Sequence, residues 1–409
     1  MSIWFCLLIP ILAALVMLKW FPKYMAWWEG VIPLIVCFVF IGIFKFTVEK
    51  VRTNDTEYQG SLMVEARYYE YWETYVHRTC TRTVSCGKNC TTTISYDCSY
   101  CDENPEHWTV VNSLGNEYGI SKEFYDFLVK KWKANPAFVE LNRDIDNSGG
   151  CGKDGDMYRI NWNKDPMTAE ATTTDHWYEN RVQAAHTAFD YPDITEDDVK
   201  NYGLFDYPEL TGHQQETVLG LDKVKWMSRH ESDTMKQWSK FLNGYLGVRK
   251  HARIYFLFFT DKPSLAANMQ EAYWDGGNDN ELVVCVGLSS KTKELQWVRP
   301  FSWSPERRII PDVRDMVMAH GVFKPNYISE SVWSQVEKEY KRKDFKEFSY
   351  VTVEPPTWAK WTTFFITLII TGLVCWWAIV NEIDSEYDPI KEYFINRRNR
   401  NNYGGGYRY

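Results

Sequence analysis

Three long apolar runs constrain the fold of this chain more than any other feature. Residues 3–20 and 31–46 carry one lysine each, and residues 361–380 carry no charged side chain. An α-helix needs about 20 apolar residues to cross the hydrocarbon core of a bilayer. Tryptophans near the ends of the runs suit the membrane–water interface, where this residue is enriched. We therefore predict three transmembrane helices, at about 3–20, 29–46 and 359–380.

A secretory signal peptide is the alternative for the first run, and a buried helix of a soluble protein is the alternative for all three. A signal peptide requires a basic start and a small-residue cleavage site, but the chain begins MSIW and continues FPKYMAWW after Trp20. Surface helices of soluble proteins carry one polar face, and no polar face interrupts these runs. The residues therefore favour a multi-pass integral membrane protein in contact with the lipid bilayer.

Basic residues do not decide the orientation of the chain in the membrane. Three crossings place the central region and the polar tail at 381–409 on opposite sides. Lysines and arginines flank both sides in almost equal number, so the positive-inside rule gives no preference. Cysteine usage has to decide the orientation instead.

Six of the ten cysteines lie outside the apolar runs and outside the apolar segment around Cys285. Disulfides between them would staple a threonine-rich β-ribbon that has little core of its own. Alternatively, Cys86-x3-Cys90 and Cys98-x2-Cys101 would form two knuckles that hold Zn²⁺; free buried thiols are a third alternative. The even number favours disulfides, which would place the large domain outside the cytoplasm. The six cysteines are Cys80, Cys86, Cys90, Cys98, Cys101 and Cys151.

Residues 50–210 are predicted to form a cysteine-stapled region that is rich in β-structure and also contains helices. The segment 61–86 alternates and is rich in Tyr, Val and Thr, as half-buried strands are. Ser121 can cap a helix over 122–132, whose aromatic side chains recur at helical spacing.

Residues 212–345 are predicted to form an α/β domain. Continuous apolar strands at 252–260 and 281–288 enclose a helix, which indicates a sheet covered on both faces. The amphipathic segment before them is predicted to be one or two helices that stop at Gly244 and Gly247. With a transmembrane hairpin at 1–48, the whole chain is predicted to be a membrane-anchored α+β protein.

The part from about 250 to 321 resembles the TPM-domain family. The resemblance lies in the strand ARIYFLFFT, the helix that ends NMQEAYWDGG, and the strands NELVVCVGL and ELQWVRPF. It implies a TPM-like fold tethered outside the membrane. Some members of that family bind a divalent cation, some are reported as acid phosphatases, and others are accessory proteins of membrane complexes. The matching positions here are Asp275 and Asp279, with Asp261, although Asp275-Gly276 replaces the Ile-Gly of the family.

Several segments of the central region are similar to uncharacterised membrane proteins encoded by bacteriophages. These segments are EYWETYVHRTCT, YDCSYCDENPEHW, GDMYRINW and DHWYENRVQAAHTAF. The resemblance implies a phage source and supplies no activity.

Two acidic segments are candidate cation sites. In the turn DGGNDN, Gly276 and Gly277 would let the carboxylates of Asp275 and Asp279 converge on Ca²⁺ or Mg²⁺, ions that prefer oxygen ligands. The alternative is a flexible turn whose Asp and Asn side chains cap their own backbone. The segment 144–157 matches only the first half of a calcium-binding loop, because glycine stands where the closing acid belongs.

The residues favour an interaction protein over an enzyme. The sequence lacks a phosphate-binding P-loop, a GxSxG motif and an HExxH motif. Its net charge of −8 argues against a nucleic-acid partner. The predicted function is a membrane-anchored structural or interaction protein, phage-encoded, whose partners are other membrane or virion proteins. The alternative is a phosphatase-like enzyme of the TPM type that depends on a divalent cation.

Overall fold

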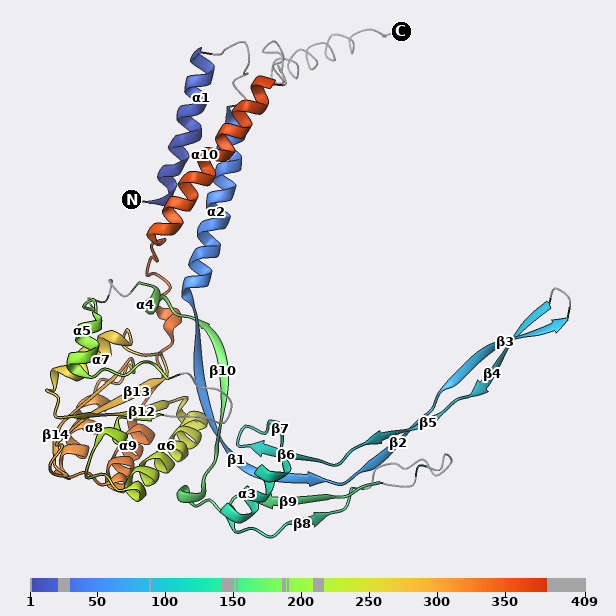
Figure 1. Ribbon diagram of the computed structural model, residues 1–409, viewed down its shortest axis with the longest axis vertical. Helices are drawn as coiled ribbons and strands as arrows, with labels where there is room; N and C mark the ends of the chain where they lie inside the picture. Colours follow the sequence, from blue (N-terminus) through green and yellow to red (C-terminus); the bar gives the residue numbers. More distant parts are fainter. Residues whose placement is uncertain are drawn as a thin grey trace, which may run out of the picture. The chain divides into compact units, whose positions relative to one another are not determined.

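The described residues of the chain form two compact units (Figure 1). An anchor unit comprises Met1–Asp55, Tyr178–Asp190 and Phe345–Tyr409, and a large unit comprises Thr56–Trp177 and Tyr191–Asp344. The computed structural model describes residues 2–20, 30–87, 90–141, 151, 154–185, 189, 191–208 and 217–380.

Three helices of the anchor unit are long and apolar enough to cross a membrane. The first spans Ile3–Trp20 as a short 3-10 turn, η1 (Ile3–Leu7), followed by α1 (Leu8–Trp20). The others are α2 (Val31–Thr53) and α10 (Thr357–Val380). All three predicted apolar helices are therefore present, and α2 continues seven residues past its predicted end at 46.

A stripe of threonines marks the buried side of α10. Thr363, Thr367 and Thr371 are buried, and each hydroxyl donates to the carbonyl four residues earlier, at 2.8, 2.6 and 2.7 Å. The Thr371 hydroxyl also lies 3.9 Å from the Cys37 sulfur of α2. Small side chains whose hydroxyls are satisfied within the helix let two apolar helices approach closely, so this stripe explains the packing of α10 on α2.

Two arginines tie the polar end of α2 to the other segments of the anchor unit. Arg52 donates to the carbonyl oxygens of Ala184, at 2.9 Å, and Glu354, at 2.5 Å. Arg181, at the start of the short helix α4 (Arg181–Ala184), pairs with Glu49 of α2 at 3.0 Å and donates to the Val351 carbonyl at 2.9 Å. These charge-assisted bonds explain why α2 extends beyond its apolar run.

A six-stranded sheet forms one part of the large unit, with strand order β7-β6-β1-β9-β8 and β10 paired to β1. The pairings of β1 with β6 and β9, of β6 with β7 and of β8 with β9 are antiparallel. The helix α3 (Lys122–Trp132) packs on this sheet through Leu128 and Trp132, and the predicted N-cap Ser121 accepts from Phe124 N. The strands are β1 (Asn54–Tyr69), β6 (His107–Asn112), β7 (Glu117–Ile120), β8 (Ala137–Val139), β9 (Met157–Asn161) and β10 (Ala171–Glu179).

A four-stranded sheet with order β11-β12-β13-β14 forms the other part of the large unit. Its first three strands are parallel and β14 is antiparallel to β13. Both β12 and β13 are buried on both faces, as their continuous apolar sequences predict. The strands are β11 (Val218–Leu219), β12 (Arg253–Thr260), β13 (Glu281–Leu288) and β14 (Leu295–Ser302).

Helices cover the two faces of this four-stranded sheet. Ile254, Phe256 and Phe258 face α6, α8 and α9, whereas the intervening residues Tyr255 and Leu257 face α7 and α5. The helices are α5 (Glu196–Tyr202), α6 (Arg229–Lys250), α7 (Leu265–Tyr273), α8 (Ile309–Met318) and α9 (Pro325–Glu339). The predicted α/β architecture is present.

The prediction that Gly244 and Gly247 stop the helix is wrong, because α6 runs without a break to Lys250. Both glycines instead make room for β1. A Cβ atom on Gly247 would overlap the Gly60 backbone, and one on Gly244 would overlap the Leu62 side chain. Glycine is needed here because a helix and a strand lie backbone against backbone.

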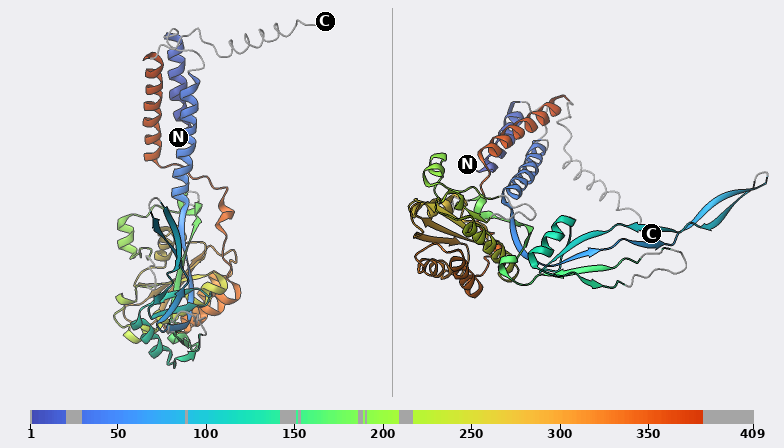
Figure 2. Two further views of the ribbon diagram at one scale, coloured as in Figure 1. Left: turned by 90° about the vertical axis from the view of Figure 1, so that its right-hand side faces the viewer. Right: turned by 60° about the horizontal axis from the view of Figure 1, so that its bottom comes forward.

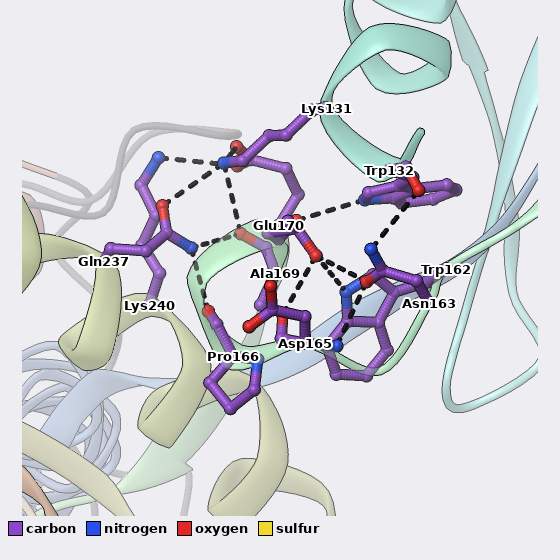
Figure 3. Close-up of polar contacts among 11 residues, drawn as sticks. Lys131, Trp132, Trp162, Asn163, Asp165, Pro166, Ala169, Glu170, Gln237 and Lys240 are labelled. Atoms are coloured by element: carbon purple, nitrogen blue, oxygen red, sulfur yellow. Dashed lines mark hydrogen bonds and ion pairs between the residues drawn. The ribbon is translucent and has the colours of Figure 1, made fainter. Parts of the chain in front are cut away.

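A polar network joins α3 to α6 through the segment around η2 (Pro166–Thr168) (Figure 3). The Glu170 carboxylate forms ion pairs with Lys131 of α3 and with Lys240 of α6, the latter at 3.4 Å. Gln237 of α6 donates to the Ala169 carbonyl at 2.6 Å. Leu62 of β1 also belongs to the core of the α/β part. The structure therefore groups most of the predicted regions 50–210 and 212–345 into one unit.

Candidate functional site

A two-part β-ribbon extends from the larger sheet of the large unit and forms an arm (Figures 1 and 2). Near the sheet, β2 (Trp72–Val76) pairs with β5 (Tyr100–Asn104). Further out, β3 (Thr79–Gly87) pairs with β4 (Cys90–Asp97). Each pair forms a two-stranded sheet of its own. Such ribbons are marginally stable in water, so the arm needs another source of stability.

Two disulfides supply the additional stability that the arm needs. Cys80 pairs with Cys98 across the base of the β3–β4 hairpin, with Cα atoms 5.8 Å apart. Cys101 of β5 pairs with Cys151, with Cα atoms 5.9 Å apart. The disulfide prediction is confirmed for these four cysteines, and the zinc alternative is wrong for Cys98 and Cys101, whose sulfurs are bonded to other partners.

Glu73 lies beside the Cys101–Cys151 disulfide, and its carboxylate is close enough to both sulfurs for shared metal ligation. The two sulfurs are bonded to each other, so they are not available as thiolate ligands. The side chains of Cys86 and Cys90 lie outside the described residues, and so does the predicted cation segment around Asp144 and Asp146.

The β3–β4 hairpin has two chemically different faces, because successive side chains of a strand point to opposite sides. One face carries Arg82 and Val84 beside Ile94 and Tyr96, and the Arg82 guanidinium lies 5.8 Å from the Tyr96 ring centre. The other face presents exposed hydroxyl groups in register. These come from Thr79, Thr81, Thr83, Thr91, Thr93 and Ser95.

The three predicted metal ligands are not brought together. Asp261 follows the carboxyl end of β12, where its carboxylate accepts from Ser290 N at 2.9 Å. Asp279 precedes β13, next to the opposite end of the same parallel pair. The eight residues of the strands separate the two ends by about 23 Å. Asp275 lies near Tyr191, whose pKa is raised by burial and by the neighbouring carboxylates of Glu271 and Asp275.

Asp279 instead belongs to a buried acidic cluster with Glu57 and Arg342. The Asp279 side chain is 1% exposed, and its Oδ2 accepts from Arg342 Nη2 at 2.7 Å and Nε at 3.1 Å. The same Nη2 lies 2.8 Å from Glu57 Oε2. One guanidinium thus contacts two carboxylates that are far apart in the sequence, Glu57 in β1 and Asp279 before β13.

Both carboxylic acids of this cluster resist ionisation. Burial, together with the adjacent Asp279 carboxylate, raises the pKa of Glu57 to about 8. Burial also raises the pKa of Asp279, although the Arg342 guanidinium opposes that rise. Two buried carboxyl groups that share one cation hold a proton between them near neutral pH. Arg342 thus holds distant chain segments together through its ion pairs. We call Glu57, Asp279 and Arg342 the ion-paired clasp.

A second buried polar group lies close to this clasp. Arg253 is 1% exposed, and none of its guanidinium nitrogens has a hydrogen-bond partner among the described residues. Its charge lies 5.9 Å from the ring centre of Tyr58 and 5.7 Å from that of Tyr255. Arg253 is the direct neighbour of Glu281 across the parallel pair β12–β13. Cation–π contacts and a nearby carboxylate therefore compensate this buried charge.

Sequence reasoning missed Glu57, Arg342 and Arg253. Arg253 leaves a signal, because it is the one charged residue within the apolar strand ARIYFLFFT. Glu57 and Arg342 leave no such signal in the sequence, because they lie in polar segments far from Asp279.

Comparison of the chain with protein-family models, with curated proteins and with solved structures gives no match. The TPM and bacteriophage resemblances therefore rest on the quoted residues alone.

Proposed function

We propose that this chain is a membrane-anchored interaction protein that presents its large unit, with the disulfide-stapled arm, to a protein partner outside the cytoplasm. The observation that carries this proposal is the arm. Its hairpin β3–β4 contributes no residue to the hydrophobic cores of the described chain, so it does not serve to fold the large unit. Two disulfides nevertheless hold the arm in shape.

The three apolar helices support the anchoring part of the proposal. Disulfides persist in oxidising compartments, which supports an extracytoplasmic large unit. The proposal includes a bacteriophage source and, as partners, other membrane or virion proteins, on the strength of the segment resemblances. The predicted ligands do not support the phosphatase-like alternative, because Asp279 is engaged by Arg342 and Asp261 lies at the other end of the β12–β13 pair.

The membrane part of the proposal predicts the side of each segment. A reporter fused after Tyr409 and one inserted after Gly115, in the exposed turn between β6 and β7, are expected to report opposite compartments, with the inserted reporter outside the cytoplasm. Of the three apolar helices, only α10 lies between these two positions, so its crossing of the membrane requires this result. If both reporters lie on one side, α10 does not cross the membrane.

The interaction part of the proposal predicts that the outer hairpin of the arm, β3–β4, is dispensable for folding and required for binding to the partner. In a variant in which a Gly-Gly linker replaces residues 79–97 and Cys98 is changed to Ser, membrane insertion is expected to persist. Amine cross-linking in native membranes is expected to yield at least tenfold less of the protein's complexes. Leu114→Ser, which changes an exposed side chain in the turn between β6 and β7, is the control and should leave them unchanged. Undiminished complexes without the arm would contradict the proposed function.

A further inference from the structure

The two outer edges of the β3–β4 hairpin differ in charge. Within the described residues, each strand pairs only with the other, so one edge of β3 and one edge of β4 carry unpaired backbone groups. The β3 edge has Arg82 at its centre. From Thr91 to Tyr96, the β4 edge has no charged side chain, no proline and no glycine.

An edge of this kind is a template for strand pairing. Natural proteins protect exposed strand edges with lysine or other charges, with proline, with bulges or with covering elements. The β4 edge shows none of these over six exposed residues, four of which are the β-branched residues Thr91, Thr92, Thr93 and Ile94. High β-propensity and low charge favour the addition of another strand.

We propose that β4 pairs antiparallel with β4 of a second copy of this chain, about a twofold axis at Thr93, to form a four-stranded sheet. This inference rests on the proposed function of the arm as an interaction surface and names its partner. The symmetric pairing is isologous, as most homodimer contacts are.

The register about Thr93 is chemically self-complementary. Thr93 opposes its own copy, Thr91 opposes Ser95, and Thr92 opposes Ile94, so hydroxyl meets hydroxyl on one face. Cross-strand threonine and serine pairs are favourable, and like charges directly opposite each other are not. No like charges meet at β4. The same symmetry applied at the centre of the β3 edge would oppose two Arg82 guanidinium groups.

Membrane anchoring favours a second copy as the occupant of this edge. A six-residue edge buries little area and gives weak association in dilute solution. Copies anchored in one membrane share their orientation and a high local concentration, which converts a weak contact into a populated one. The β4 edge from Thr91 to Tyr96 also carries no charged side chain that would attract a partner of opposite charge.

Cross-linking of the full-length protein in lipid vesicles tests this inference. In Thr93→Cys, the two new sulfurs would lie across the twofold axis, where opposed Cα atoms are about 4.5–5.5 Å apart and a disulfide can form. Mild oxidation is expected to convert most of the protein to a covalent dimer. Thr83→Cys is the matched control on the same face. The two copies of residue 83 would be separated by three strand spacings, about 14 Å, so this variant should form no covalent dimer.

Introduction of a charge at the contact gives a second readout. Thr93→Lys is expected to weaken dimerisation at least tenfold, because two ammonium groups would meet at the axis, whereas Thr83→Lys should change it less than twofold. Formation of the Cys80–Cys98 disulfide, measured by mass spectrometry, verifies that each variant folds. Equal cross-linking at positions 83 and 93, or none at 93, would overturn the inference.

The outcomes separate this inference from the proposed function. If Thr93→Cys gives no dimer while removal of the arm still abolishes the complexes, the arm binds a different protein and only the second-copy inference fails. If complexes persist without the arm, both fail.

Discussion

Replacement of Arg342 by alanine is expected to lower the free energy of unfolding of the large unit by about 3 kcal/mol. Arg342 contacts two buried carboxylates, Asp279 and Glu57. Removing one partner of a buried ion pair typically costs about 3–5 kcal/mol, and the partial exposure of Arg342 places the expected value at the lower end. Chemical unfolding of the detergent-solubilised chain, followed by tryptophan fluorescence, measures this loss of unfolding free energy.

The pH dependence of the stability loss in Arg342→Ala shows whether the ion pairs of Arg342 cause that loss. Without Arg342, the two carboxylates lose the cation that they share, so the loss is expected to be smaller at low pH, where the carboxyl groups bind protons, and to grow toward pH 8. In the native chain, the raised pKa of Glu57, about 8, means that the folded state binds more protons than the unfolded state between about pH 4.5 and 8. The contribution of Glu57 to stability therefore falls as pH rises through this window.

Glu57→Gln is the matched control for this pH dependence. It keeps the uncharged shape of the protonated acid and removes the titration, so the stability of this variant is expected to vary less with pH between 4.5 and 8. A loss in Arg342→Ala that is the same at all pH values would show that the effect is one of packing and not of the shared proton.

Replacement of Gly247 by leucine is expected to destabilise the large unit by about 3 kcal/mol or more. Even a Cβ atom at this position overlaps the Gly60 backbone of β1, and the strand cannot move away without separating from α6. Overpacking of a well-packed core usually costs about 1–3 kcal/mol, and here the obstacle is backbone and not a flexible side chain. Loss of the cooperative thermal transition is the expected observation.

Gly119→Leu provides the control for Gly247→Leu. Gly119 lies in the exposed strand β7, and a Cβ atom there meets nothing within 4 Å. This variant is expected to change the unfolding free energy by less than about 0.5 kcal/mol, as surface substitutions do. A similar loss at both positions would attribute the effect to the leucine side chain and not to the contact between α6 and β1.

The features that sequence predicts well here are those carried by local patterns. Apolar length alone locates the three long helices, and continuous apolar sequence locates β12 and β13. Ser121 marks the start of α3 because its side chain caps a neighbouring amide. Each of these features depends on residues within a few positions of one another.

Features that depend on distant residues could not be predicted in the same way. Gly244 and Gly247 look like helix stops because glycine is a poor helix former, and only the approach of β1 shows why α6 keeps them. The partner of Cys101 is fifty residues away in the sequence. Asp279 looked like a cation ligand because its actual partner, Arg342, belongs to a segment that no spacing rule connects to it.

The ion-paired clasp also bears on how such a chain can be assembled from parts. Glu57 and Arg342 lie within two residues of the first and last residues of the large unit, Thr56 and Asp344, and they touch. A module whose two ends meet can be inserted between two helices of an existing membrane protein without stretching either, as domain insertions succeed where termini are close. The chain also returns to the anchor unit over Tyr178–Asp190, so a transfer of the large unit to other helices would have to carry that segment with it.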